Sequence, residues 1–160
     1  MTKITVYTDG SALGNPGPGG YGIVMISGKH RKDFFQGYQL TTNNRMELLA
    51  VIVALETIKQ PGAEVTIYSD SKYVVDAIEK GWVFAWVKKG FKKKKNPDLW
   101  RRLLEIYPKH KVKFVWVKGH AGNPLNERCD QLAVDAANGS DLLEDKGYVE
   151  SKNLDEGGLF

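Results

Sequence analysis

The sequence has few of the residues that build exported, disulfide-bonded or membrane-embedded proteins. One cysteine, Cys129, occurs among 160 residues, so no internal disulfide can form. No apolar run approaches the roughly 18 residues that a membrane-spanning helix needs, and no basic and apolar leader opens the chain. These absences predict a cytoplasmic protein that does not associate with a membrane.

What remains is the composition of an ordinary globular domain, with 42% hydrophobic and 26% charged residues. A length of 160 residues suits one domain with a proper core better than two. We expect residues 1–140 to form this domain. Residues 141–160 form an acidic C-terminal tail that contains glycine, and we expect its last residues, 157–160, to be loose or weakly docked.

Four stretches alternate like strands, and a fifth follows a long helix. Residues 3–9, 21–26 and 33–40 are close enough in sequence to pair antiparallel. Residues 44–58 are apolar nearly all round, which predicts a buried helix. Since a strand, a helix and a returning strand make a right-handed parallel connection, residues 64–69 should lie beside the first strand. With residues 111–118 as the last strand, the fold class is α/β: a five-stranded mixed sheet, three strands antiparallel and two parallel, flanked by helices. The remaining helices are expected at residues 71–79, 82–88, 96–107 and 125–137.

Acidic residues follow two of the predicted neighbouring strands. Asp9 comes at the end of the first strand, before a glycine-rich loop, and Asp70 comes directly after residues 64–69. Glu47 lies early in the apolar helix, where an unpaired buried carboxylate would be costly; favourable interaction with the helix dipole is the alternative explanation. Asp130 lies near the start of the last helix, where an acid that simply faces solvent is the stronger interpretation from the residue alone.

If these acids converge, they need a counter-charge, because neighbouring like charges raise one another's pKa. Several carboxylates with oxygen ligands only suit Mg²⁺ or Mn²⁺, whereas zinc would want cysteine or several histidines. His120, between glycines in the segment VKGHAGNP, is a candidate proton shuttle beside such a site. A pair of divalent cations is well suited to an in-line displacement at phosphorus, so the substrate should be a phosphodiester.

The positive charge is concentrated in one segment. Residues 88–95 (KKGFKKKK) hold six lysines and no acid, although the net charge of the whole chain is only +4. Trp82 and Trp86 precede this block, and Phe91 lies within it. Lysines bind phosphates and flat rings stack on bases, so the combination indicates a nucleic acid. The alternatives are a solvated lysine surface and aromatic side chains that only pack the core.

Five blocks of the sequence together resemble the bacterial type 1 ribonuclease H family, in the same order and over about residues 3–148: TDGSALGNPGPGGYG, TTNNRMELLAVIVAL, YSDSKYV, KNPDLW and WVKGHAGNPLNERCDQLA. The resemblance implies a ribonuclease H-like fold, with residues 1–140 as the catalytic domain and residues 82–96 as its basic protrusion, which holds the DNA strand. It implies hydrolysis of the RNA strand of RNA–DNA hybrids by two metal ions, with Mg²⁺ as cofactor and Mn²⁺ as a possible substitute. The products would carry 3′-hydroxyl and 5′-phosphate ends.

Carried over by position, Asp9, Glu47, Asp70 and Asp130 would be the metal ligands and catalytic acids. His120 would assist product release or proton movement. The resemblance places Asn15, Asn43 and Asn44 in the minor groove of the hybrid, and Thr42 and Asn96 around a phosphate of the DNA strand. The full set of substrate-binding residues that it implies is Gly10, Asn15, Thr42, Asn43, Asn44, Lys72, Trp82, Trp86, Lys88, Lys89, Phe91, Lys92 and Asn96.

The sequence departs from the family pattern at three places. Lys72 stands where many relatives have glutamine, Ala12 stands where cysteine is frequent, and the segment between Phe91 and Asn96 is short and almost pure lysine. Two other functions stay open at this stage: a non-catalytic module that binds RNA–DNA hybrids, and a transposase- or integrase-like nuclease that acts on DNA. We expect a monomer with no obligate protein partner.

Overall fold

The computed structural model describes residues 2–119 and 121–157. A mixed sheet runs through the molecule in the order β5-β4-β1-β2-β3-β6. Its strands are β1 (Lys3–Ala12), β2 (Gly17–Ser27), β3 (His30–Thr41), β4 (Glu64–Ser69), β5 (Lys111–Trp116) and β6 (Leu142–Leu143). The first three strands are antiparallel, and β4 and β5 lie parallel to β1. The predicted α/β class and mixed sheet are therefore confirmed.

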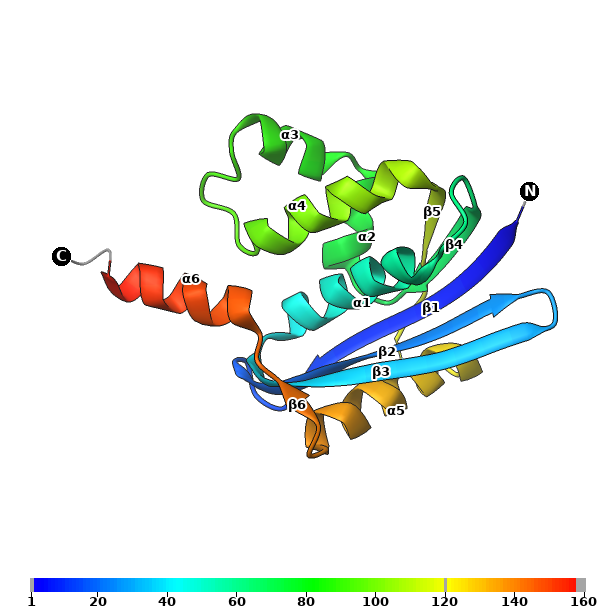
Figure 1. Ribbon diagram of the computed structural model, residues 1–160, viewed down its shortest axis with the longest axis horizontal. Helices are drawn as coiled ribbons and strands as arrows, with labels where there is room; N and C mark the ends of the chain where they lie inside the picture. The colour runs from blue at the N-terminus through cyan, green and yellow to red at the C-terminus, as the bar shows by residue number, and fades with distance from the viewer. Residues whose placement is uncertain (1, 120, 158–160) are drawn as a thin grey trace.

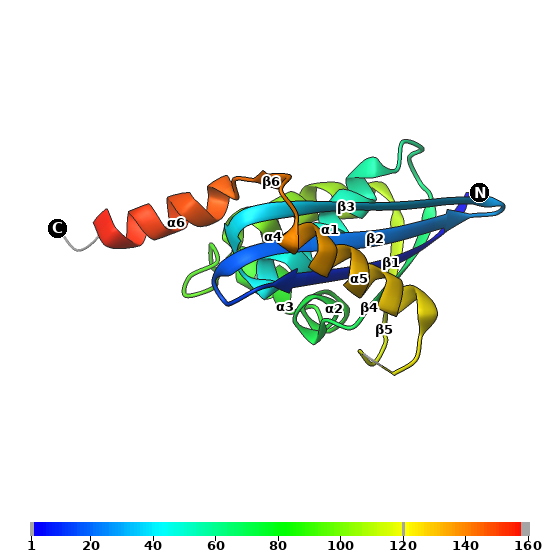
Figure 2. The same ribbon diagram turned by 90° about the horizontal axis from the view of Figure 1, so that it is seen from below.

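Helices cover both faces of this sheet. They are α1 (Asn43–Thr57), α2 (Lys72–Glu79), α3 (Trp82–Lys88), α4 (Pro97–Ile106), α5 (Pro124–Asn138) and α6 (Lys146–Gly157), with a short 3₁₀ turn at Tyr107–Lys109. Figures 1 and 2 show α1, α2 and α4 on one face and α5 on the other. Among the described residues, no helix combines the length and apolar character needed to cross a bilayer.

Strand alternation divides the core between the two faces. Val6 and Ile23 point toward α1, whose residues from Leu48 to Leu55 are almost all buried, as the apolar sequence of this helix predicts. Tyr7 and Val24 point the other way, toward Cys129 and Leu132 of α5. Cys129 is fully buried there, so it serves as a packing residue.

Glycines let α5 lie directly on the sheet. A Cβ atom on Gly22 of β2 would collide with the backbone carbonyl of Cys129, and one on Gly37 of β3 would collide with that of Ala136. The backbones of helix and sheet therefore meet directly at these points. The glycines of β2 and β3 therefore determine how closely α5 packs against the sheet.

Two expectations about the strands need correction. The first strand does not end at Asp9 but continues to Ala12, because residues 10–12 pair with the glycine-rich segment that was expected to be a loop. The sheet also has six strands rather than five, since Leu142 and Leu143 pair parallel with β3. The second difference arises in the acidic C-terminal tail, for which no strand was expected.

A buried ion pair fixes the start of that C-terminal segment. Arg45 of α1 donates to both carboxylate oxygens of Asp145, at 2.8 and 2.9 Å, and also to both oxygens of Asp98. The Asp145 carboxylate accepts a further hydrogen bond of 2.7 Å from Thr41. Burial alone would lower the pKa of Arg45, but the bonds to Asp98 and Asp145 outweigh it and raise that pKa, so the guanidinium stays charged. An arginine 3% exposed thus joins α1, α4 and the segment that leads into α6.

Candidate active site

Asp9 lies where the sheet changes from parallel to antiparallel pairing. The parallel register of β1 with β4 stops at Thr8 and Ser69, whereas the antiparallel register with β2 continues past Asp9. Asp70 follows Ser69 directly. The two carboxylates therefore come from adjacent strands at the point where β4 leaves the sheet, a typical position for binding sites in α/β proteins.

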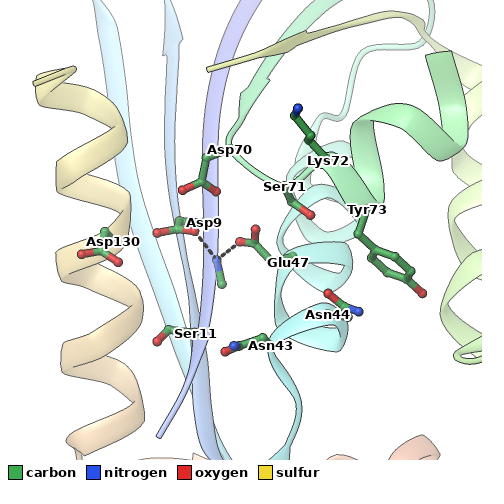
Figure 3. A pocket seen from close by; sticks show the side chains of 11 residues that line it. Asp9, Ser11, Asn43, Asn44, Glu47, Asp70, Ser71, Lys72, Tyr73 and Asp130 are labelled. Atoms are coloured by element: carbon green, nitrogen blue, oxygen red, sulfur yellow. Dashed lines mark hydrogen bonds between the residues drawn. The ribbon is translucent and has the colours of Figure 1, made fainter. Parts of the chain in front are cut away.

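Glu47 reaches the same point from α1, which crosses β1 at Gly10. A Cβ atom on Gly10 would collide with the backbone of Met46 and Glu47, so only glycine lets the helix come this close. The Gly10 backbone N–H donates to Asp9 Oδ1 at 2.9 Å and makes a short hydrogen bond to Glu47 Oε1. Figure 3 shows both bonds converging on this nitrogen.

Three of the four predicted acids form a compact cluster. One carboxylate oxygen from each of Asp9, Glu47 and Asp70 lies within 4.8 Å of the others. Asp130 lies on α5, across from Asp9 (Figure 3), and lines the same cavity without belonging to this set of three. His120 lies outside the described residues.

The cluster is unfavourable for three ionised carboxylates. Burial raises the pKa of Asp9 to about 8, and the charges of Asp70 and Asp130 add to the rise. Burial, followed by the charges of Asp9 and Asp70, also raises the pKa of Glu47. A divalent cation would remove this conflict, and a set of oxygen donors without sulfur or imidazole fits a hard cation such as Mg²⁺ or Mn²⁺.

The acids open into a cavity of about 420 Å³, the acidic hollow, which is lined by the four acids together with polar side chains that include Ser11, Asn43, Asn44, Ser71, Lys72 and Tyr73. Two neighbouring cavities share residues with it. The aromatic hollow, about 300 Å³, is lined by Asn44, Tyr73, Trp82, Trp86 and Lys93–Lys95. The amide hollow, about 520 Å³, includes Asn15, Thr42, Asn44, Asn96, Lys94 and Lys95. Asn44 lines all three, so they form one continuous surface from the acids to the lysines.

The basic segment contributes to this surface only in part. Trp82 is 48% exposed, and the Lys94 ammonium lies 5.0 Å from the ring centroid of Trp86. Phe91 is buried, with the Arg101 guanidinium over its ring, so its position is that of a packing residue rather than of a substrate contact. The exposed side chains of Lys88, Lys89 and Lys92 do not belong to the residues that line the three hollows.

The predicted groove residues are held by hydrogen bonds at the start of α1. Thr42 caps this helix by accepting from Arg45 N, and Asn15 Oδ1 accepts from Asn43 N at 3.2 Å. Asn43 Oδ1 in turn accepts from the backbone N–H of Ala12 at 2.6 Å.

Asn96 and Lys72 have partners of their own. Asn96 donates to the Tyr73 hydroxyl at 3.1 Å and accepts from Arg45 at 3.2 Å. The Lys72 ammonium lies 4.7 Å from the ring centroid of Trp116.

Several residues that line the hollows were not predicted from the sequence, and four of them are Tyr73, Tyr148, Ser151 and Lys152. Tyr73 could have been found, because it follows Asp70 by three residues, so the first turn of the next helix carries it back toward the acid. The other three belong to α6. Nothing in the composition of an acidic tail distinguishes them from solvent-facing residues.

The fold and the site together define an α/β protein with a carboxylate cluster suited to divalent cations, placed at one end of a basic and amide-rich surface. The family model for RNase H matches residues 1–138, and the chain belongs to this family. It is 55% identical over 151 residues to the ribonuclease H of Syntrophus aciditrophicus, which covers 91% of this chain and 87% of that protein. The ribonuclease H of Trichodesmium erythraeum is 55% identical over 152 residues, covering 92% and 96%. The chain is thus a ribonuclease H enzyme and, as such, a nuclease.

Solved structures agree with this assignment. LC9-RNase H1, described as a type 1 RNase H with the type 2 active-site motif, matches with a TM-score of 0.79 and 37% identity, covering 94% of this chain and 80% of that one. LC11-RNase H1, solved in complex with an RNA/DNA hybrid, matches with a TM-score of 0.58 and 28% identity, covering 84% and 96%.

Proposed function

We propose that this enzyme hydrolyses the RNA strand of RNA–DNA hybrids with Mg²⁺ as cofactor and leaves 3′-hydroxyl and 5′-phosphate ends. The observation that carries the proposal is the continuity of the acidic hollow with the aromatic and amide hollows through Asn44. A double-stranded substrate needs one place for chemistry and another for the second strand, and this surface supplies both. The LC11-RNase H1 complex with a hybrid supports the same choice of substrate.

In this proposal the acids hold the cations. Asp9, Glu47 and Asp70 supply the converging oxygens, and Asp130 completes the set from α5. Two bound cations would clamp the attacking and leaving oxygens of the phosphodiester. The Gly10 N–H, which donates to both Asp9 and Glu47, keeps these two carboxylates in place. His120 is assigned to proton movement or product release on the basis of the family resemblance.

The polar residues beside the acids are assigned to strand discrimination. Amide groups of Asn15, Asn43 and Asn44 can exchange hydrogen bonds with 2′-hydroxyls, which distinguish RNA from DNA. Thr42 and Asn96 are assigned to a phosphate of the DNA strand, with the lysines behind them. Such contacts fix register and affinity rather than sequence choice, so cleavage should show little sequence preference.

The test is a cleavage assay on a hybrid labelled at the RNA strand. With Mg²⁺ the RNA strand should be cut while the DNA strand stays whole, and EDTA should stop the reaction. Fragments extended by a polymerase would demonstrate the 3′-hydroxyl ends. Cutting of duplex DNA would instead favour the integrase-like alternative, and binding without cleavage would favour the hybrid-binding module.

Asp9→Asn and Asp70→Asn should each abolish cleavage, because either change removes a carboxylate from the cluster of three while preserving shape. Circular dichroism should show that both variants keep the fold. Retention of the parent rate in either variant would contradict the assignment.

The cytoplasmic location and the monomeric state stay predictions. Cell fractionation can check the location, and sedimentation can check the monomeric state.

A further inference from the structure

The amide hollow is lined by one lysine that does not belong to the basic segment. Lys94 and Lys95 are the end of that segment, and the third cation, Lys152, comes from α6. The other described residues that line it are neutral, with amide and hydroxyl groups prominent among them, and none of them carries a carboxylate. A cavity with cations, neutral hydrogen-bonding groups and no acid in its described lining is suited to an anion.

The start of α6 is fixed beside this hollow. The Asp145 carboxylate accepts from Arg45 and from Thr41, and its Oδ1 also accepts from the backbone N–H of Tyr148 in the first turn of α6. Arg45 donates to Asn96 as well. One buried guanidinium therefore positions both the start of α6 and a side chain of the hollow.

The side chain of Lys152 lies over a rigid neighbour. Tyr148 is 7% exposed, and the Lys152 ammonium lies 5.6 Å from its ring centroid. Residues four apart share one face of a helix, so Tyr148 and Lys152 face the hollow together. Lys146, on the same helix and also exposed, does not belong to the residues that line the hollow.

We propose that α6 is part of the substrate-binding surface: Lys152 supplies the cation that contacts a DNA-strand phosphate held between Thr42, Asn96 and the end of the basic segment. This inference rests on the proposed function for its substrate. It assigns a binding role to a segment whose composition is acidic overall. In Figures 1 and 2, α6 extends beyond the sheet, so the bound duplex would have a longer footprint than the three-layer body alone provides.

The test compares Lys152→Gln with Lys146→Gln, each in an Asp9→Asn background that should leave the RNA strand uncut. Both variants lose one positive charge from the same helix. Affinity for a fluorescently labelled hybrid is measured by anisotropy between about 50 and 200 mM salt. Lys152→Gln should weaken binding about two- to fivefold, the effect of losing one exposed ion pair, and flatten the slope of log K against log salt by about 0.7–0.9. Lys146→Gln should change neither quantity.

A second series locates the phosphate. Hybrids carry one uncharged methylphosphonate at successive positions of the DNA strand, and Lys152→Gln should have no further effect at the linkage that it contacts. An unchanged salt slope in Lys152→Gln, an equal loss in both variants, or the absence of coupling at every DNA linkage would each overturn the proposal. Because binding is measured without cleavage, failure here is distinct from failure of the proposed function, which appears as an uncut hybrid with the unaltered protein.

Discussion

At the scale of single residues, Asp9 has opposite effects on stability and on activity. Its carboxylate lies 5% exposed beside two other acids, an arrangement that can attract cations but opposes folding when none is bound. Burial raises its pKa from 3.8 to about 8. The folded, cation-free protein therefore keeps a proton on Asp9 at a pH where the unfolded chain has lost it.

This difference predicts a pH-dependent effect of Asp9→Asn on stability. The contribution of protonated Asp9 is complete below about pH 4 and is lost as the pH rises to about 8, because unfolding then releases a proton. In EDTA at pH 8, Asp9→Asn should be more stable than the unaltered protein by several kcal/mol, since the shift spans about four pKa units and each unit is worth about 1.4 kcal/mol. Thermal melts should show a difference of several degrees at pH 8 and little at pH 4. An equal difference at both pH values, or the same gain in the exposed-site control Asp141→Asn, would contradict this account.

Gly10 is a second residue on which activity should depend, because its backbone lies in close contact with α1. Gly10→Ala places a methyl group against the backbone of Met46 and Glu47, which cannot move independently of α1. We expect Glu47 to move away from Asp9, with cleavage reduced at least tenfold and stability lowered by about 1–3 kcal/mol from overpacking. Gly139→Ala is the control, because its methyl group would meet neighbours only at 3.4 Å. Cleavage rates and urea unfolding of both variants test the prediction, which fails if both behave alike.

At the scale of elements, the helices and strands around the acids follow from local sequence patterns. Residues 64–69 were predicted as the strand that returns after the long helix, and β4 has these bounds in the structure. The apolar sequence of residues 44–58 predicted the buried helix α1. A carboxylate after a strand and another inside an apolar helix then identified Asp70 and Glu47 as unusual. These patterns are visible because burial determines where apolar residues occur along each element.

The extension of β1 and the docking of residues 142–157 could not be predicted in this way. Residues 10–12 became strand because a partner segment rich in glycine lies beside them, and such a segment resembles a loop when considered alone. The docking of α6 depends on Arg45, which is 100 residues away from Asp145 in the sequence. Composition describes Asp145 as one more acid of a polar tail, although tertiary contacts make it buried.

The docking of α6 predicts that Asp145→Asn destabilises the fold. The change leaves Arg45, which is 3% exposed, with Asp98 as its remaining carboxylate partner. Removing one partner from a buried ion pair costs about 3–5 kcal/mol, and the remaining partner favours the lower end of this range. Urea unfolding should show this decrease, whereas Asp141→Asn, at an exposed acid of the same segment, should change stability by less than about 0.5 kcal/mol. Equal stability of the two variants would show that the pair does not hold the segment.

At the scale of the whole molecule, charge is separated along one surface. The acids lie at one end of the three hollows with Lys72 beside them, whereas the other lysines of this surface line the two hollows beyond Asn44. Lysines attract the phosphate backbone over a distance comparable to the Debye length, whereas the acids attract cations. This separation lets one surface bind a polyanion and still concentrate divalent cations at a single place.

Replacing Lys92–Lys95 with glutamine should therefore weaken hybrid binding more than it slows the turnover step. The slope of log K against log salt should flatten by up to about 0.9 for each phosphate that the protein no longer neutralises. Lys88→Gln/Lys89→Gln is compared with Lys94→Gln/Lys95→Gln, which loses the same number of charges, because Lys88 and Lys89 lie outside the three hollows whereas Lys94 and Lys95 line two of them. Anisotropy titrations give the slopes, and single-turnover cleavage at saturating protein gives the chemical rate. If the slope of log K against log salt is unaltered when all of Lys92–Lys95 are replaced, the basic segment does not belong to the interface.

The direct backbone contact between α5 and the glycines of the sheet limits how this enzyme can be engineered for heat tolerance. Replacing glycine with alanine commonly stabilises a protein by restricting the unfolded chain, and Gly22 would be an obvious target because it lies within a strand. A methyl group there would press on the carbonyl of Cys129 and lift the helix that carries the neighbouring Asp130. The usual gain in stability is therefore not expected at Gly22: the clash should lower the melting temperature and also move Asp130 away from the other three acids. Screens of this scaffold should keep Gly22 and Gly37 fixed and vary residues away from the α5 face.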